Sequence, residues 1–235
     1  MGYYLCSMLF FLFLGTKNEQ IPMIPGHSTS RDTTIQHFTY LALGDSYTIG
    51  ESVPEADRFP NQAVRLLAEE GITVAPPRII AKTGWTTDEL EAAIGEANVT
   101  DTFSIVTLLI GVNNQYRGRS TAEYKTQFTS LLKQAIHFAG DHSDRVVVLS
   151  IPDWGAVPFA EGRDREQIAA EIDAFNAVNK TVSKKFKVHY IDITPDTRKA
   201  AQDPGLVASD GLHYSGRGMG VWAGKLAAVM SGMLK

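Results

Sequence analysis

The sequence lacks cysteine almost entirely, since Cys6 is the single one. One cysteine cannot form a disulfide framework or a cysteine-based zinc site within one chain. We expect no thiol catalysis either, because Cys6 lies in a segment that resembles a leader. Any chemistry of this chain must therefore come from other side chains.

An excess of positive charge is also missing. The 235 residues contain 22 Lys and Arg against 26 Asp and Glu, which gives a formal net charge of -4. The basic residues do not gather into a run with interleaved aromatic side chains, the pattern typical of nucleic-acid binding. We therefore expect no nucleic-acid partner. The length and composition fit one globular domain, and we find no internal repeat.

Long hydrophobic runs are limited to one, Tyr3 to Leu14, and at about a dozen residues it is shorter than the roughly 20 that a membrane-spanning helix needs. The run resembles a secretory signal and predicts export, to the periplasm or as a secreted protein. No Lys or Arg precedes it and no Ala-x-Ala site follows it, so a membrane anchor and a start at Met23 stay open. We expect a leader over residues 1–20, a tether rich in Pro, Ser, Thr and Gly over 21–36, and a folded domain over 37–235.

Beyond the tether, short apolar runs alternate with helical patterns. The alternation predicts strands joined by right-handed helical crossovers, and hence a parallel sheet covered on both faces. The fold class is α/β, and we expect Thr87 to cap the second helix. The predicted strands are Phe38 to Leu43, Arg78 to Ala81, Ser104 to Ile110, Arg145 to Ile151 and Val188 to Ile193, and the predicted helices are Phe59 to Glu70, Thr86 to Ala97, Ser120 to Ala139, Glu166 to Lys185 and Gly216 to Met233.

Polar clusters follow these strands at the points where ligands bind in open α/β sheets. A serine directly after a buried strand, as Ser46 is, exposes its hydroxyl to the crevice, although alone it could equally make a local turn or cap. The clusters are Gly44-Asp45-Ser46, Lys82-Thr83-Gly84-Trp85-Thr86-Thr87, Gly111-Val112-Asn113-Asn114 and Asp210-Gly211-Leu212-His213.

In their order and placement these clusters resemble the four blocks of the SGNH (GDSL) hydrolase family, over roughly Tyr40 to Ala228. The resemblance implies a three-layer α/β/α sandwich with a flavodoxin-like five-stranded parallel sheet, the SGNH hydrolase fold, in strand order 2-1-3-4-5. It also implies ester hydrolysis without a metal or another cofactor. The implied roles are nucleophile for Ser46, base for His213, its orienting partner for Asp210, and oxyanion donors for the backbone N–H groups of Ser46 and Gly84 and the side chain of Asn113.

Two positions depart from the family pattern. Tyr47 stands where the motif has leucine, and Asn114 replaces an aspartate often found after the third block's asparagine. The second departure affects only the polarity around Asn113, which is itself present.

The chemistry agrees with the resemblance. A serine hydroxyl is a weak nucleophile at neutral pH and needs an adjacent base, which histidine can supply. A carboxylate three residues away, Asp210, can hold one ring nitrogen of His213 while the other points to Ser46, as in catalytic triads on unrelated folds.

Other candidates carry weaker signals. The remaining histidines, His27, His37, His137, His142 and His189, show no metal-ligand spacing, so we expect no metal site. Trp85 and Trp154 could line a pocket or simply pack, and Asp153 could be a pocket residue or part of a Pro-Asp turn. The glycine-rich stretch at Gly216 is expected to begin a helix rather than to bind phosphate, because no strand precedes it.

We therefore expect a serine carboxylic ester hydrolase for small-molecule esters. The polar loops and the absence of a long apolar insertion favour short acyl or acetyl groups. Three alternatives stay open: an O-acyltransferase, a lysophospholipase or thioesterase using the same site, and a non-catalytic module that binds glycans or lipids. An acylated sugar or a lysophospholipid could be the ester, and the sequence leaves the oligomeric state open.

Overall fold

The computed structural model describes residues 1–3 and 37–235. Apart from its first three residues, the predicted leader lies outside the described residues, as does the predicted tether, so both stay predictions. No helix within these two ranges combines the length and the apolar character needed to cross a membrane.

Five parallel strands form the sheet at the centre of the domain. Their order is β2-β1-β3-β4-β5, which confirms the predicted flavodoxin-like arrangement. Every residue of β1, β3 and β4 is buried, as expected for apolar strands covered on both faces. The strands are β1 (Tyr40–Gly44), β2 (Arg78–Ala81), β3 (Ile105–Leu109), β4 (Val146–Leu149) and β5 (His189–Ile191).

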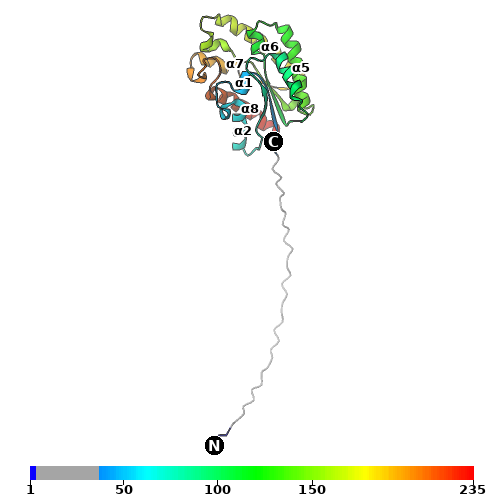
Figure 1. Ribbon diagram of the computed structural model, residues 1–235, viewed down its shortest axis with the longest axis vertical. Helices are drawn as coiled ribbons and strands as arrows, with labels where there is room; N and C mark the ends of the chain where they lie inside the picture. Colours follow the sequence, from blue (N-terminus) through cyan, green and yellow to red (C-terminus); the bar gives the residue numbers. More distant parts are fainter. Residues whose placement is uncertain (4–36) are drawn as a thin grey trace. The chain divides into compact units, whose positions relative to one another are not determined.

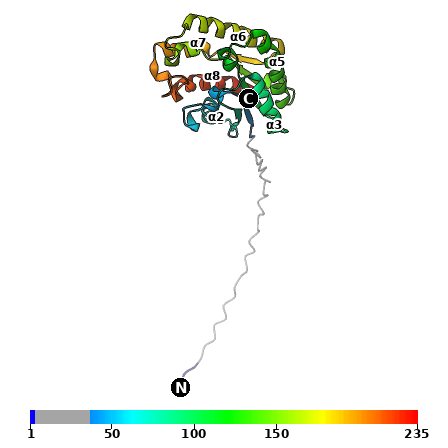
Figure 2. The same cartoon turned by 45° about the horizontal axis from the view of Figure 1, so that its top comes forward.

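Long helices cover both faces of this sheet, which completes three layers. Helices α3, α5 and α6 pack together on one face, and α2 and α8 pack against each other on the opposite face (Figures 1 and 2). Each presents apolar side chains to the sheet at helical spacing, which is why the sequence pattern identified all five. They are α2 (Phe59–Glu69), α3 (Thr87–Ala97), α5 (Thr121–Phe138), α6 (Arg165–Phe186) and α8 (Gly216–Leu234).

Most predicted boundaries agree with the structure within one or two residues, but the predicted cap of α3 was wrong. Thr86, not Thr87, is the N-cap: its side chain and that of Glu89 form a reciprocal capping box. Thr87 is the first helical residue, and its N–H donates to the Asn114 side chain instead. The sequence also did not predict the short helices α1 (Ser46–Ile49), α4 (Val112–Tyr116) and α7 (Thr194–Thr197), which are too brief to show a period.

The chain crosses from one side of β1 to the other between β2 and β3, so a switch point lies at the carboxyl ends of β1 and β3. Strand β1 leads into α1 and Ser46, and β3 leads into α4 and Asn113. Gly44, the last residue of β1, is packed too closely for a side chain, because a Cβ there would clash with the Thr48 side chain and the Leu109 carbonyl. The glycine thus lets α1 begin directly against the sheet.

Candidate active site

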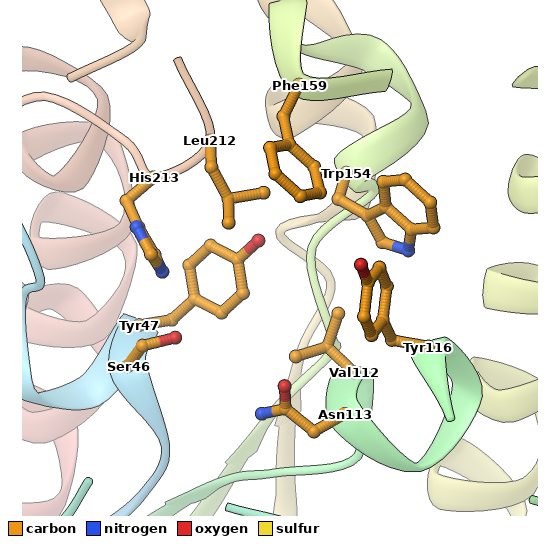
Figure 3. Close-up of a pocket in the computed structure, with 9 residues that line it drawn as sticks. All are labelled: Ser46, Tyr47, Val112, Asn113, Tyr116, Trp154, Phe159, Leu212 and His213. Carbon is orange, nitrogen blue, oxygen red and sulfur yellow. The ribbon is translucent and has the colours of Figure 1, made fainter. Parts of the chain in front are cut away.

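A cavity of about 150 Å³ lies at this switch point. Its wall combines polar side chains from the first, third and fourth sequence blocks with a set of apolar and aromatic ones (Figure 3). The lining residues are Ser46, Tyr47, Val112, Asn113, Tyr116, Trp154, Phe159, Leu212 and His213.

Ser46 is the first residue of α1, held there by the side chain of Asp45, which accepts the N–H of Tyr47 at 3.0 Å. Within the described part of the chain the Ser46 hydroxyl makes no hydrogen bond, although its residue is only 4% exposed. Figure 3 shows a ring nitrogen of His213 on the side that faces this hydroxyl. The structure thus brings Ser46 and His213, distant in sequence, to one cavity.

Asp210 holds His213 tightly. The Nδ1–H of His213 donates to Asp210 Oδ2 at 2.6 Å, while Oδ1 accepts the backbone N–H groups of Leu212 and His213, both at 2.9 Å. The Ser52 hydroxyl donates to the same Oδ2 at 2.6 Å. Partial burial alone would raise the pKa of Asp210, but the hydrogen bonds from Ser52, His213 and the backbone outweigh it and hold this pKa well below its usual range.

A carboxylate that stays ionised fixes the imidazole in one tautomer. With Nδ1 donating to Asp210, the other nitrogen, Nε2, is left as a proton acceptor towards the cavity. Asp192, the carboxylate directly after β5, accepts from the Ser150 hydroxyl and the Thr194 N–H instead and makes no hydrogen bond to His213. Of these two carboxylates, Asp210 is therefore the one that orients the histidine.

Asn113 reaches the cavity from the start of α4. One N–H of its side-chain amide donates to the Trp85 carbonyl at 3.0 Å, and the amide carries a second N–H that this bond does not use. In Figure 3 the amide nitrogen lies on the side of the cavity where Ser46 stands. Asn113 thus has a donor free for a ligand.

Gly84 is not among the residues that line the cavity, although the resemblance assigns it an oxyanion role. It lies one residue before Trp85, and its carbonyl accepts from Arg117 at 2.7 Å. Its φ of +84° is in the left-handed region that only glycine adopts easily, so the loop conformation explains the residue type. The structure connects Gly84 to Asn113 through the Trp85 carbonyl, but it gives no contact of the Gly84 N–H with the cavity.

Asn114 is not among the residues that line the cavity, and it connects α4 to the first residue of α3. Its side-chain oxygen accepts the Thr87 N–H at 3.1 Å, and its amide donates to the Thr87 hydroxyl at 2.7 Å. An ionised aspartate, which only accepts, could make the first of these bonds but not the second. The Thr87 hydroxyl uses its own hydrogen to donate to Gln127, so it needs a donor at position 114. Asparagine in place of the family's aspartate supplies that donor.

An aromatic wall, made by Tyr116, Trp154 and Phe159, closes one side of the cavity. The rings of Trp154 and Tyr116 meet edge to face with centroids 5.3 Å apart, and those of Trp154 and Phe159 lie 6.1 Å apart. Trp154 is fixed by its N–H, which donates to the Gln115 side chain at 2.7 Å. Of the two tryptophans that the sequence singled out, Trp154 lines the cavity and Trp85 does not.

Hydrogen bonds and an ion pair hold the segment that carries Trp154 and Phe159 in place. The side chain of Asp153 accepts the Gly155 N–H and pairs with Arg198, so this aspartate is a structural turn residue rather than a pocket residue. Arg165 donates to the carbonyls of Gly155 and Val157. The polar loops expected near the site are thus joined by an aromatic segment, from which Trp154, one of the two pocket candidates, and Phe159, which the sequence did not indicate, line the cavity.

Asp45 stands out as a buried carboxyl beside the site. Its Oδ2 atom has no hydrogen-bond partner among the described residues. Burial raises the pKa of Asp45 from 3.8 to about 7, against the hydrogen bond from the Tyr47 N–H, which lowers it. Between about pH 4 and pH 7 the folded protein therefore holds a proton here that the unfolded chain releases.

We predict that this carboxyl makes the protein less stable as the pH rises. Since the folded state binds the proton more tightly, the free energy of unfolding falls through that range, by up to about 4 kcal/mol. Asp45→Asn keeps an oxygen to cap α1 and cannot ionise. The melting temperature of the wild type should therefore drop more between pH 5 and pH 8 than that of Asp45→Asn. An equal drop in melting temperature between pH 5 and pH 8 in the two proteins would contradict the prediction.

Among residues 1–3 and 37–235, no group of three His, Cys, Asp or Glu side chains is placed to hold a metal ion.

Comparisons with known proteins agree with this architecture. The structure is similar to that of TesA, with a TM-score of 0.66 and 18% sequence identity over 83% of this chain and 99% of that one. It is also similar to a lipase/acylhydrolase from Enterococcus faecalis, with a TM-score of 0.66 and 21% identity over 84% of this chain and 97% of that one. For Axe2, an acetylxylan esterase from Geobacillus stearothermophilus, the TM-score is 0.63 and the identity is 18%, over 82% of this chain and 94% of that one. No curated protein sequence matches the chain.

The sequence model of one family matches residues 42–221, from β1 into α8, and so spans all the blocks that meet at the cavity. The fold and this match place the protein in the class of hydrolases that act on ester bonds. The chain belongs to the GDSL-like Lipase/Acylhydrolase family.

Proposed function

We propose that this protein is a serine carboxylic ester hydrolase that works through an acyl-enzyme. The observation that carries the proposal is the arrangement of Ser46 and His213 in one cavity, with His213 held by the ionised Asp210. Family membership supports it, as do the solved neighbours described as a lipase/acylhydrolase and an acetylxylan esterase.

The proposed mechanism gives each of these residues one role. Ser46 Oγ attacks the acyl carbonyl while His213 Nε2 takes its proton, and Asp210 stabilises the imidazolium that forms. The free N–H of the Asn113 amide and the N–H of Ser46 hold the oxyanion of the tetrahedral intermediate, and the family resemblance adds the N–H of Gly84 as a third donor. His213 then returns the proton to the leaving alcohol. Water, activated by the same histidine, releases the acid.

The direct test is to trap the serine. The wild type should hydrolyse 4-nitrophenyl acetate and take up one fluorophosphonate group, located by peptide mass spectrometry on Ser46. The Ser46→Ala protein should take up no label. An unlabelled wild type that also fails to hydrolyse esters would leave only the non-catalytic binding module.

We predict a preference for short acyl chains. A cavity of about 150 Å³ has the volume that holds a benzene molecule in an engineered protein core, so it offers room for an acyl group of about six carbons. The aromatic wall, which neighbouring side chains hold in place, limits how long an acyl chain the cavity accepts. The value of kcat/KM for 4-nitrophenyl acetate or butyrate should therefore exceed that for the decanoate. A higher value for decanoate would contradict this and favour a lysophospholipase or thioesterase.

We predict that Asn113→Ala lowers kcat by about 10²- to 10³-fold with little change in KM. The amide would donate to charge that develops only in the tetrahedral transition state, and one such donor is worth about 2.7–4 kcal/mol. The check is kcat and KM per folded molecule, with melting temperatures measured beside them.

Asn114→Ala is the matched control for this variant. Its side chain bonds Thr87 outside the cavity, so its loss should lower the melting temperature more than kcat. If Asn113→Ala instead kept full turnover while melting earlier, Asn113 would be a turn residue only.

We also propose that the protein is exported, periplasmic or secreted, on the basis of the apolar run Tyr3 to Leu14. Cell fractionation and the mass of the mature N-terminus test this. A cytoplasmic protein with an intact N-terminus would refute it, and an intact N-terminus in the membrane fraction would indicate an anchor.

A further inference from the structure

The hydroxyl of Tyr47 is a polar group inside the cavity that the proposed mechanism does not use. Tyr47 directly follows Ser46 and is only 2% exposed. Its ring packs on the rings of His213, Tyr214 and Trp222, with centroids 5.3, 6.1 and 6.3 Å away. The hydroxyl makes no hydrogen bond to any described residue, and Figure 3 shows it pointing in among the lining side chains.

The Tyr47 hydroxyl is not among the described polar atoms that are both fully shielded from solvent and unpartnered, so it faces the cavity. A ligand that displaced water there would have to replace its hydrogen bonds or leave the phenol unsatisfied at a cost in binding free energy. Burial, together with the nearby Tyr214 and the carboxylates of Asp45, Asp210 and Asp153, raises the pKa of Tyr47 well above its usual value. The group therefore stays a neutral phenol that can both donate and accept a hydrogen bond.

Apart from Ser46, Asn113 and His213, which the proposed mechanism uses, most of the cavity around this hydroxyl is apolar. Val112, Leu212 and the rings of Trp154 and Phe159 share the cavity with it, and the Trp154 N–H is already bonded to Gln115. Tyr116 has the other phenol at the cavity, but its residue is 48% exposed and so can reach water. Besides the polar groups of Ser46, Asn113 and His213, a ligand that fills the cavity would therefore meet the Tyr47 hydroxyl as a further, isolated polar atom.

We propose that the Tyr47 hydroxyl hydrogen-bonds an oxygen of the substrate other than those of the reacting ester. The substrate class is then an ester of small size that carries a further hydroxyl, ether or carbonyl oxygen. That oxygen could lie on the acyl group, as in a hydroxyacyl ester, or on the alcohol, as in an acetylated sugar. In both cases the aromatic wall would cover the C–H groups beside it. This inference rests on the proposed function.

Tyr47→Phe is the discriminating variant, because it removes the hydroxyl and keeps the ring that packs on His213. Two substrate pairs identify the side that carries the oxygen. The acyl pair is 4-nitrophenyl 3-hydroxybutyrate and 4-nitrophenyl butyrate, and the alcohol pair is a monoacetylated methyl pyranoside and cyclohexyl acetate. In each pair the quantity compared is the ratio of kcat/KM for the oxygenated ester to that for its plain partner.

We expect Tyr47→Phe to lower this ratio about 10-fold or more in one pair, as when a site built for a hydroxyl meets a ligand that it can no longer bond. Tyr116→Phe, which removes the exposed phenol of the same cavity, is the matched control and should change the ratio less than about 2-fold. Ratios unchanged by Tyr47→Phe in both pairs would overturn the inference, as would a loss confined to Tyr116→Phe.

Binding measurements separate this inference from the proposed function. Calorimetry gives dissociation constants of 3-hydroxybutyrate, butyrate, methyl pyranoside and cyclohexanol for the wild type and Tyr47→Phe without any turnover. If the wild type hydrolysed no ester, the proposed function would fail. A weaker affinity of Tyr47→Phe for one oxygenated ligand alone would still support the inference, and equal affinities would overturn it.

A different observation concerns Ser52, whose hydroxyl donates at 2.6 Å to the same Asp210 oxygen that accepts from His213. Ser52 has a φ of +65°, in the left-handed region that disfavours side chains other than glycine. The conformation is strained for serine, while glycine would fit it freely but would lack the hydroxyl.

We infer that Ser52 is a positioning residue, which fixes the Asp210 carboxylate so that it can orient His213. Ser52→Ala and Ser52→Gly both remove the donor, but only glycine relieves the backbone. Both variants should lose kcat equally, about 10-fold, with KM unchanged, although Ser52→Gly should melt at a higher temperature than Ser52→Ala. Full turnover in both variants, or turnover that follows the melting temperature, would overturn this role.

The proton in the Asp210–His213 hydrogen bond gives a readout that needs no substrate. Its downfield NMR signal in the wild type should shift or broaden in both Ser52 variants. An unchanged signal would overturn the role of Ser52 even if the enzyme had no esterase activity.

Discussion

Replacing Ser46 with alanine is expected to lower kcat by about 10⁶-fold, down to the level that binding and oxyanion donors alone can supply. In the proposed mechanism no acyl-enzyme can form without the Ser46 Oγ, and His213 has no proton to remove. The fold should remain intact, because within the described residues that hydroxyl makes no hydrogen bond whose loss would destabilise α1. The measurement is steady-state turnover of 4-nitrophenyl acetate, with melting temperature as the control for folding.

The size of this loss distinguishes nucleophilic catalysis from weaker roles. If Ser46 only bound the substrate, the substitution would raise KM and leave kcat within about 10-fold. A Ser46→Ala protein that kept wild-type turnover and its thermal stability would remove Ser46 from the mechanism altogether.

Asp210→Asn is expected to lower kcat by about 10⁴-fold while the loop keeps its shape. The asparagine oxygen can still accept the backbone N–H groups of Leu212 and His213, which now bond Asp210 Oδ1. Its amide, however, would donate to His213 Nδ1, which forces the proton of the neutral imidazole onto Nε2. The histidine could then no longer accept the proton of Ser46.

Asp192→Asn is the matched control for this prediction. Asp192 also follows a strand, but it accepts from Ser150 and Thr194 rather than from His213. Its variant should keep kcat per folded molecule. The reverse result, with turnover retained in Asp210→Asn and lost in Asp192→Asn, would assign the orienting carboxylate to Asp192.

The sequence predicted the three layers well because they depend on how apolar residues are distributed along short segments. The apolar runs of β1, β3 and β4 and the apolar faces of the long helices are local properties, and helices must cover both faces of a parallel sheet. The strand order came from the resemblance, and the structure confirms it. The cap of α3 was misplaced by one residue, because the prediction did not use Glu89, which stands three residues after Thr86 and completes a capping box with it.

The site was predictable to the extent that its residues are close in sequence. Asp210 and His213 are three residues apart, and the hydrogen bond between them was expected. Ser52 was not predicted, since it meets Asp210 across 158 positions and from a left-handed turn that serine rarely adopts. Of the aromatic wall, the sequence offered Trp154 as a possible pocket residue but missed Tyr116 and Phe159. The position of Phe159 depends on short 3₁₀ turns that Asp153, Arg165 and Arg198 hold in place.

The packing of α8 determines when Ser46 and His213 come together as the chain is synthesised and folds. The loop with Asp210 and His213 leads directly into α8, and Trp222 of that helix packs on Tyr47 and on Phe59 of α2. Ser46 is thus synthesised early, while the residues that would activate it arrive near the end of the chain. A nascent or truncated polypeptide would display the serine without a base beside it, so hydrolysis would begin only when the C-terminal helix has docked.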